Sequence, residues 1–154
     1  MNQGPTNQRA TREIQLSIDS NLQDVALVGV SVRALCLHFS LAQDVAYQVE
    51  LCVVEMINNV IEHGYRFETG NPIRIEMKFE EGRVGVTLVD HAEPIERCDH
   101  QAPQFDPEDL ESLPENGYGR FLVDQIMDRV DYHRENDRNY LYMEKSFVPE
   151  RRAG

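Results

Sequence analysis

Five short segments of this 154-residue chain alternate apolar and polar residues with the two-residue period of a β-strand. Three longer segments between them follow the period of an α-helix. The order along the chain is strand, two helices, two strands, a long irregular segment, one helix and two strands. Hairpins and amphipathic helices in this order pack most simply as two layers. The order therefore predicts an α+β fold, a two-layer sandwich whose mixed or antiparallel sheet carries its helices on one face. The expected strands are 13–19, 72–80, 83–90, 130–135 and 139–148, and the expected helices are 22–39, 41–63 and 117–130.

Capping residues and turns support these boundaries. Ser20 or Asn21 can cap the first helix, and Ser40 can cap the second. Gly64 is a stop signal for the second helix. The turns "EGR" and "NDRN" predict two hairpins. The chain is thus expected to form one domain over 13–148, with a flexible N-terminus over 1–12 and a flexible tail over 149–154.

Residues 91–116 are irregular, rich in proline and acidic residues, and contain one cation, Arg97. Irregular segments of this length are uncommon in compact domains and are usually lids or binding segments. We therefore expect a functional loop here.

The net charge of -12 argues against nucleic acid, which is bound through Lys and Arg. No polybasic patch, no apolar run of membrane-spanning length and no signal-peptide core is visible, so neither a membrane partner nor secretion is expected. The three cysteines, Cys36, Cys52 and Cys98, are widely spaced and are interpreted as reduced thiols. These features together predict a cytoplasmic protein.

The second helix carries a line of polar residues where an apolar stripe would be ordinary. Glu55, Asn59 and His63 are spaced i, i+4, i+8 and share one side of a helix, which Asn58 and Glu62 widen. A carboxylate can act as a general base, and a carboxamide oxygen suits Mg²⁺. The helix alone favours a solvated face over an active site.

Two later features change that balance. Asp90 ends a strand beside the irregular segment, where its carboxylate can accept a hydrogen bond from a ligand amine. Gly117 and Gly119 open the last helix, where free backbone N–H groups and the helix dipole favour an anion. Each signal is weak by itself, and the specific feature is their combination in this order.

With these motifs the chain resembles the GHKL nucleotide-binding superfamily, whose ATP-binding domain has the Bergerat fold. Within it, the chain is similar to the small bacterial anti-sigma factor serine/threonine kinases. "EMINNVIEH" matches the N box, "DHAEPI" the first glycine box and "NGYGRFLV" the second. The resemblance covers about residues 13–148 and makes 91–116 the ATP lid.

The resemblance implies a role for each matching residue. Glu55 would be the general base, and Asn59 would hold Mg²⁺ against the phosphates of ATP. Asp90 would bind the adenine amino group, with Ala92 and Pro94 shaping the pocket; these two stand where the family usually has glycine.

The second glycine box implies further contacts with the nucleotide. His63 would lie beside the ligand-binding residues, or else it is an ordinary hydrogen-bonded residue at a helix end. The residues expected to surround the phosphates, or to pack the helix that follows, are Gly117, Tyr118, Gly119, Arg120, Phe121 and Leu122.

The resemblance also implies partners and an activity. Such a kinase phosphorylates a STAS-domain anti-sigma factor antagonist on serine or threonine, sequesters a sigma factor, and is a homodimer. The arginine that several family members carry before the second glycine box is absent, and Arg120 is the cation nearest to that box. This difference leaves open an ATP-binding module that sequesters its partner without effective phosphoryl transfer.

Two other interpretations remain. A phosphoacceptor domain using His63 would require a helical bundle. A zinc site formed by His91, Cys98 and His100 lacks the paired spacing of such sites.

Overall fold

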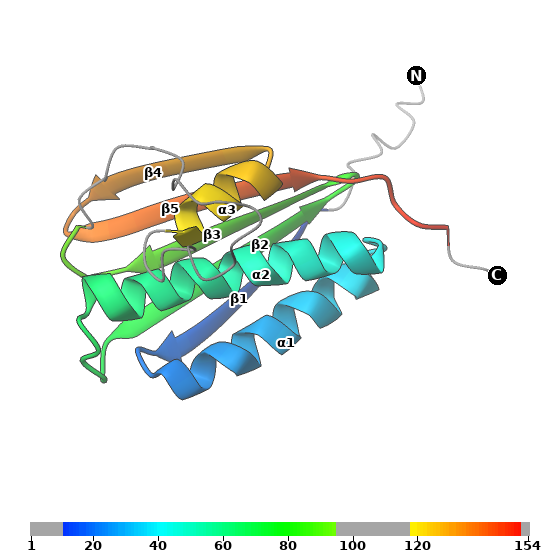
Figure 1. The fold of residues 1–154 in the computed structure, drawn as a ribbon. Helices are drawn as coiled ribbons and strands as arrows, with labels where there is room; N and C mark the ends of the chain where they lie inside the picture. Colours follow the sequence, from blue (N-terminus) through cyan, green and yellow to red (C-terminus); the bar gives the residue numbers. More distant parts are fainter. Residues whose placement is uncertain (1–10, 95–117, 152–154) are drawn as a thin grey trace, which may run out of the picture.

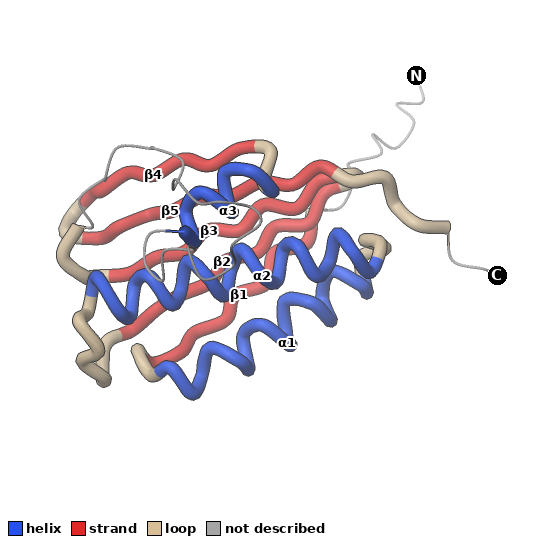
Figure 2. The backbone as a smooth tube through the Cα atoms, in the orientation of Figure 1, coloured by secondary structure: helices blue, strands red, loops and turns tan. Residues whose placement is uncertain are grey.

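The computed structural model describes residues 11–94 and 118–151, without the side chain of Tyr118. Figure 1 shows the helices packed on one face of the sheet, and Figure 2 shows the same arrangement by element type. In chain order the elements are β1 (Arg12–Asp19), α1 (Leu22–His38), α2 (Gln43–Asn59), the π-helix η1 (Val60–Gly64), β2 (Pro72–Glu80), β3 (Arg83–Asp90), α3 (Tyr118–Ile126), β4 (Arg129–Glu135) and β5 (Arg138–Ser146).

The sheet has the order β1-β2-β3-β5-β4, and all neighbouring strands are antiparallel. The two-layer α+β prediction is confirmed, and the sheet is antiparallel rather than mixed. Five strands exclude the helical bundle that a phosphoacceptor domain would need. The register places the end of β3 opposite β5, with Asp90 beside Asn139.

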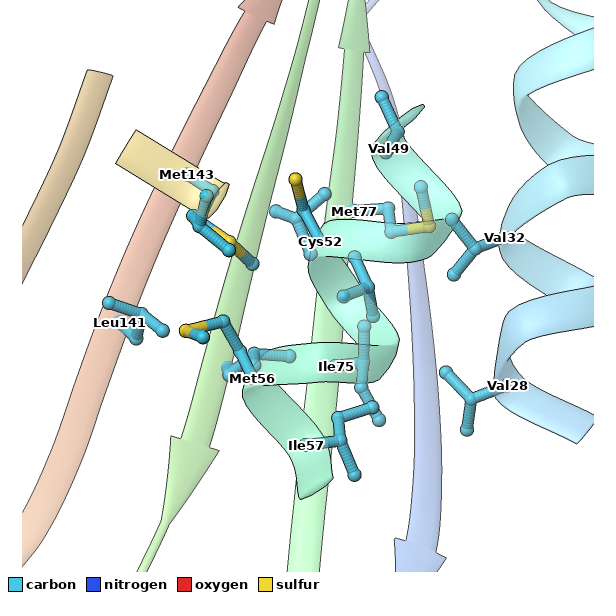
Figure 3. Packing of buried hydrophobic residues seen from close by; sticks show 14 of the residues in the cluster. Val28, Val32, Val49, Cys52, Met56, Ile57, Ile75, Met77, Leu141 and Met143 are labelled. Atoms are coloured by element: carbon cyan, nitrogen blue, oxygen red, sulfur yellow. The ribbon is translucent and has the colours of Figure 1, made fainter. Parts of the chain in front are cut away.

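The core lies between this sheet and the helices, because the apolar side chains of each strand alternate onto the helical side. Figure 3 shows α2 at its centre, with Met56 and Cys52 facing the strands and Val32 of α1 approaching from the side. Cys36 and Cys52 are fully buried and unpaired, as expected of core thiols. Burial raises the pKa of both thiols to about 12, so they stay protonated at neutral pH.

Helix α1 begins as expected, because the Asn21 side chain accepts a hydrogen bond from the backbone N–H of Gln23 at 3.0 Å. Gly29 allows α1 to approach α2 closely, since a β-carbon there would lie 3.0 Å from Val54 Cγ2. Arg33 and Glu50 form an ion pair between the two helices. These contacts fix α1 against α2 and leave its opposite side outward.

Helix α2 differs from its prediction at both ends. Ser40 is not the N-cap; it has a φ of 70° and precedes the helix, whose N-cap is Ala42 without a side-chain hydrogen bond. At the other end the α-helix stops at Asn59 and continues as η1, whose wider turn changes which residues share one side. Of the predicted polar stripe, Glu55 and Asn59 lie half-buried on α2, whereas His63 lies on η1 and is exposed.

Helix α3 is shorter than the predicted 117–130, because Val130 belongs to β4. The backbone N–H of Asp128 donates to Glu144 of β5 at 2.9 Å, so pairing with the sheet replaces the next helical turn. Lys145 Nζ donates to the carbonyl of Ile126 at 2.7 Å and satisfies the end of the helix.

In the described ranges, none of the helices combines the length and apolar character that crossing a membrane requires.

Candidate functional site

Three motifs that are distant in sequence come together at one end of the helical layer. They are the C-terminal half of α2 with η1, the end of β3, and the start of α3. Figure 1 shows α3 beginning beside α2 and over the central strands. Two close approaches, at Gly119 and at Gly64, join these motifs, and both depend on the absence of a side chain.

The first approach brings the start of α3 onto the polar side of α2. A β-carbon built at Gly119 would lie 3.0 Å from Glu55 Oε2 and 3.5 Å from the Asn59 carboxamide nitrogen. Glu55 and Asn59 are half-buried, so they are not part of an open solvated face. The site thus combines a carboxylate, a carboxamide and the first turn of a helix, the groups that a metal–phosphate complex uses.

The second approach joins η1 to the segment after β3. A β-carbon at Gly64 would lie 2.7 Å from Ala92 Cβ, closer than two side chains can come. Tyr65 adds a polar link, because its hydroxyl accepts from the backbone N–H of His91 at 2.8 Å and donates to the carbonyl of Pro72 at 2.9 Å. Burial raises the pKa of Tyr65, which keeps this hydroxyl protonated.

Asp90 lies at the end of β3 and is only 5% exposed. Its Oδ1 accepts two hydrogen bonds, from Asn139 Nδ2 at 2.8 Å and from the backbone N–H of Ala92 at 2.9 Å. Burial raises the pKa of Asp90 above its ordinary value, while these two hydrogen bonds act in the opposite direction. Its Oδ2 accepts no hydrogen bond from any residue that the structure describes.

Sequence reasoning missed the residues that hold Asp90 from the other side. Asn139 is 3% exposed and contacts Tyr132 and Arg134 of β4. Asn139 was expected at the start of the last strand, and it does belong to β5, but no functional role was assigned to it. A signal existed: Asn139 shares the inward face of its strand with Leu141 and Met143, and a polar residue in such a row is unusual.

The remaining predicted residues take varied positions. His63 of η1 and Pro94 after β3 are exposed. Phe121 and Leu122 are half-buried on α3. Arg120 forms an ion pair with Asp124 at 3.1 Å, one turn along the helix. Predictions that lie outside the described residues are those for Gly117, the side chain of Tyr118, the lid beyond Pro94, and the zinc candidates Cys98 and His100.

A separate hollow of about 330 Å³ lies on the face of the sheet opposite the helices. Gly85 and Tyr142 both line it, and the Tyr142 ring packs over the position that a side chain at Gly85 would occupy. Its lining includes Glu13, Glu76 and Lys78, and no residue of the three motifs. Charges of both signs are typical of a solvated sheet face, so we do not place the functional site there.

Comparisons with known proteins agree with this geometry. Residues 18–145 match the family of the histidine kinase-like ATPase domain. Proteins named serine-protein kinase RsbW from Bacillus cereus and Bacillus anthracis are each 23% identical over 122 residues, covering 77% of this chain and 75% of the relative.

A solved structure supports the fold. The crystal structure of the RsbU and RsbW domains of Rv1364c from Mycobacterium tuberculosis is similar, with a TM-score of 0.61 and 10% sequence identity. The match covers 91% of this chain and 35% of that longer protein. The chain therefore belongs to the histidine kinase-like ATPase family, the GHKL superfamily, and is similar within it to serine-protein kinases.

Proposed function

We propose that this protein is a cytoplasmic anti-sigma factor serine/threonine kinase that binds Mg·ATP, phosphorylates a STAS-domain antagonist and sequesters a sigma factor. The observation that carries the proposal is the contact of Gly119 with Glu55 and Asn59. It brings a candidate base and a candidate metal ligand to the start of a helix, and the Gly64–Ala92 contact adds Asp90 to the same end of the molecule.

The donor atoms present fit a magnesium–nucleotide complex. Asn59 would supply a hard carboxamide oxygen to Mg²⁺, and the lack of a side chain at Gly119 lets the start of α3 approach Asn59 and Glu55 closely. Bound Mg²⁺ would neutralise charge on the phosphates during transfer. At the purine end of the nucleotide, Asp90 Oδ2 would accept a hydrogen bond from the adenine amino group. Ala92, packed against Gly64, would form the adjoining wall of the pocket.

Glu55 would act on the protein substrate. The hydroxyl oxygen of a serine or threonine attacks the γ-phosphorus, the bond from that phosphorus to the β,γ-bridging oxygen breaks, and ADP leaves. The hydroxyl proton passes to the Glu55 carboxylate, which is half-buried next to the helix start.

The test is transfer of the γ-phosphoryl group to a STAS-domain antagonist by wild type and Glu55→Gln. We expect the variant to transfer roughly a hundredfold to ten-thousandfold more slowly while its affinity for ATP changes little. Glu50→Gln is the matched control, since Glu50 lies on the same helix but pairs with Arg33. Equal transfer rates for wild type and Glu55→Gln would contradict the assigned role of Glu55.

A second candidate is an ATP-binding module that sequesters its partner without effective transfer. The ion pair of Arg120 with Asp124 favours it, because this cation near the second glycine box is already partly neutralised. Charge neutralisation dominates the catalysis of phosphoryl transfer. Undetectable transfer by a wild-type protein that binds both ATP and a sigma factor would support this candidate.

We further propose that the protein is a homodimer formed through the outer side of α1. This side exposes large apolar residues, with Leu27 and Val30 each 66% exposed, and Leu22 and Leu37 are also exposed. An apolar row of this kind on a helix usually marks a contact with another protein. Arg33, exposed on the same helix, forms an ion pair with Glu50 of α2.

A further inference from the structure

Asn139 makes every hydrogen bond of which its side chain is capable. Its Nδ2 donates to Asp90 Oδ1 at 2.8 Å and to the carbonyl of Ala92 at 2.9 Å. Its Oδ1 accepts from the Tyr132 hydroxyl and from Arg134 Nη1, each at 2.8 Å. A buried carboxamide with four partners is held in one orientation.

Arg134 decides which orientation that is. A guanidinium group can only donate, so the oxygen of Asn139 must face Arg134 and its nitrogen must face Asp90. Arg134 Nη1 also donates to the carbonyl of Ala92 at 3.1 Å, which holds the backbone after Asp90 in place. We call Tyr132, Arg134 and Asn139 the hairpin clamp, since all three come from the β4–β5 hairpin.

The clamp makes the two oxygens of Asp90 unequal. Oδ1 faces two N–H donors, from Asn139 and from Ala92, so a proton on Oδ1 would be repelled. Oδ2 receives no hydrogen bond from the described part of the chain. Oδ2 therefore has a fixed direction, and none of the described residues donates to it.

We propose that the hairpin clamp determines which purine nucleotide the site accepts. It does so by presenting Asp90 Oδ2 as a fixed hydrogen-bond acceptor for the exocyclic amino group of the purine. A purine with a keto oxygen at the same position would bring two acceptors together and leave both unpaired. The proposal rests on the proposed function, in that it assumes nucleotide binding at Asp90. It assigns to the clamp a positioning role, because its side chains act through Asp90.

The test compares ATP with inosine triphosphate, in which a keto oxygen replaces the amino group of the purine ring. Affinities of both for the full chain are measured by calorimetry in the presence of Mg²⁺. We expect wild type to favour ATP by roughly a hundredfold, because a site built to pair with a donor rejects a ligand without it.

In Asn139→Leu the ratio of the two affinities is expected to fall roughly tenfold, because Asp90 is released to rotate. Tyr132→Phe and Arg134→Gln each remove one donor to Asn139, so they carry the test if Asn139→Leu does not fold, and a smaller fall is expected. The matched control is Asp137→Asn, since Asp137 is 99% exposed and lies 3.7 Å from Arg134 Nη2. It should keep the wild-type ratio.

The ratio separates positioning from a general loss of stability, which would weaken both nucleotides alike. If ATP binds to wild type but the folded clamp variants keep the wild-type ratio, the clamp inference is overturned and the proposed function stands. If wild type binds neither nucleotide, both are overturned.

Discussion

Asp90 is a buried carboxylate to which the described residues donate hydrogen bonds at only one of its two oxygens, and its burial lowers the free energy of unfolding at neutral pH. Burial is the larger influence on its pKa and raises it above the ordinary 3.8, against the hydrogen bonds from Asn139 and Ala92. The native state therefore binds a proton more tightly than the unfolded state does. The free energy of unfolding falls as the pH rises from the unfolded pKa through the native one, and stays at that lower level above it.

Asp90→Asn should remove this pH dependence. The variant keeps an oxygen for Asn139 and Ala92 and loses the buried charge. Urea unfolding between about pH 4 and about pH 8 should show the variant gaining stability relative to wild type as the pH rises. It should also lose ATP binding, so stability and function move in opposite directions. A difference in stability that stays constant with pH would contradict this account.

The contact between Gly64 and Ala92 predicts a specific pair of substitutions. Gly64→Ala places a β-carbon 2.7 Å from Ala92 Cβ, and we expect a loss of roughly 1–3 kcal/mol in the free energy of unfolding. Ala92→Gly removes the methyl group that this β-carbon would meet. Adding Gly64→Ala to Ala92→Gly should therefore cost much less stability than adding it to wild type. Urea unfolding of the three variants measures this. Additive losses in the double variant would show that the methyl groups do not collide.

At the scale of elements, sequence patterns predicted which segments form helices and strands, but not where each one ends. The N-cap Asn21 and both hairpins follow local rules and were predicted. The end of α3 was not, because the residues from Met127 to Val130 suit a helix and are taken up instead by pairing with β5. The π-helix Val60–Gly64, which replaces the last turn of the predicted helix, has no local signature in the sequence.

The outer side of α1 gives the prediction for this scale. Val30→Asp places a charge at the centre of the exposed apolar row, and we expect it to convert a dimer into a monomer in sedimentation experiments. Val148→Asp is the matched control, because Val148 is 87% exposed but lies outside α1, and it should remain dimeric. A monomeric wild type would contradict the homodimer proposal.

At the scale of the whole molecule, the site joins segments that are far apart in sequence, so ligand binding should stabilise the complete fold. A ligand that binds only the native state adds about 2.7 kcal/mol at about 100 times its dissociation constant. We expect Mg·ATP to raise the melting temperature of wild type, and Asn59→Ala to lose most of this shift. Gln43→Ala, at the exposed start of α2, should keep it. An equal shift for Asn59→Ala would remove Asn59 from the site.

The sequence by itself determined the fold class, the order of elements and the three motifs, because periodicity, caps and glycine positions are local properties of the chain. It also proposed Glu55, Asn59, Asp90 and Gly119 as members of one site, through resemblance to a family. Only the tertiary structure brought Gly119 onto Glu55 and Asn59, and Ala92 onto Gly64. It alone revealed Asn139 and its partners, because strand register decides which residue stands beside Asp90, and register depends on pairing between distant segments.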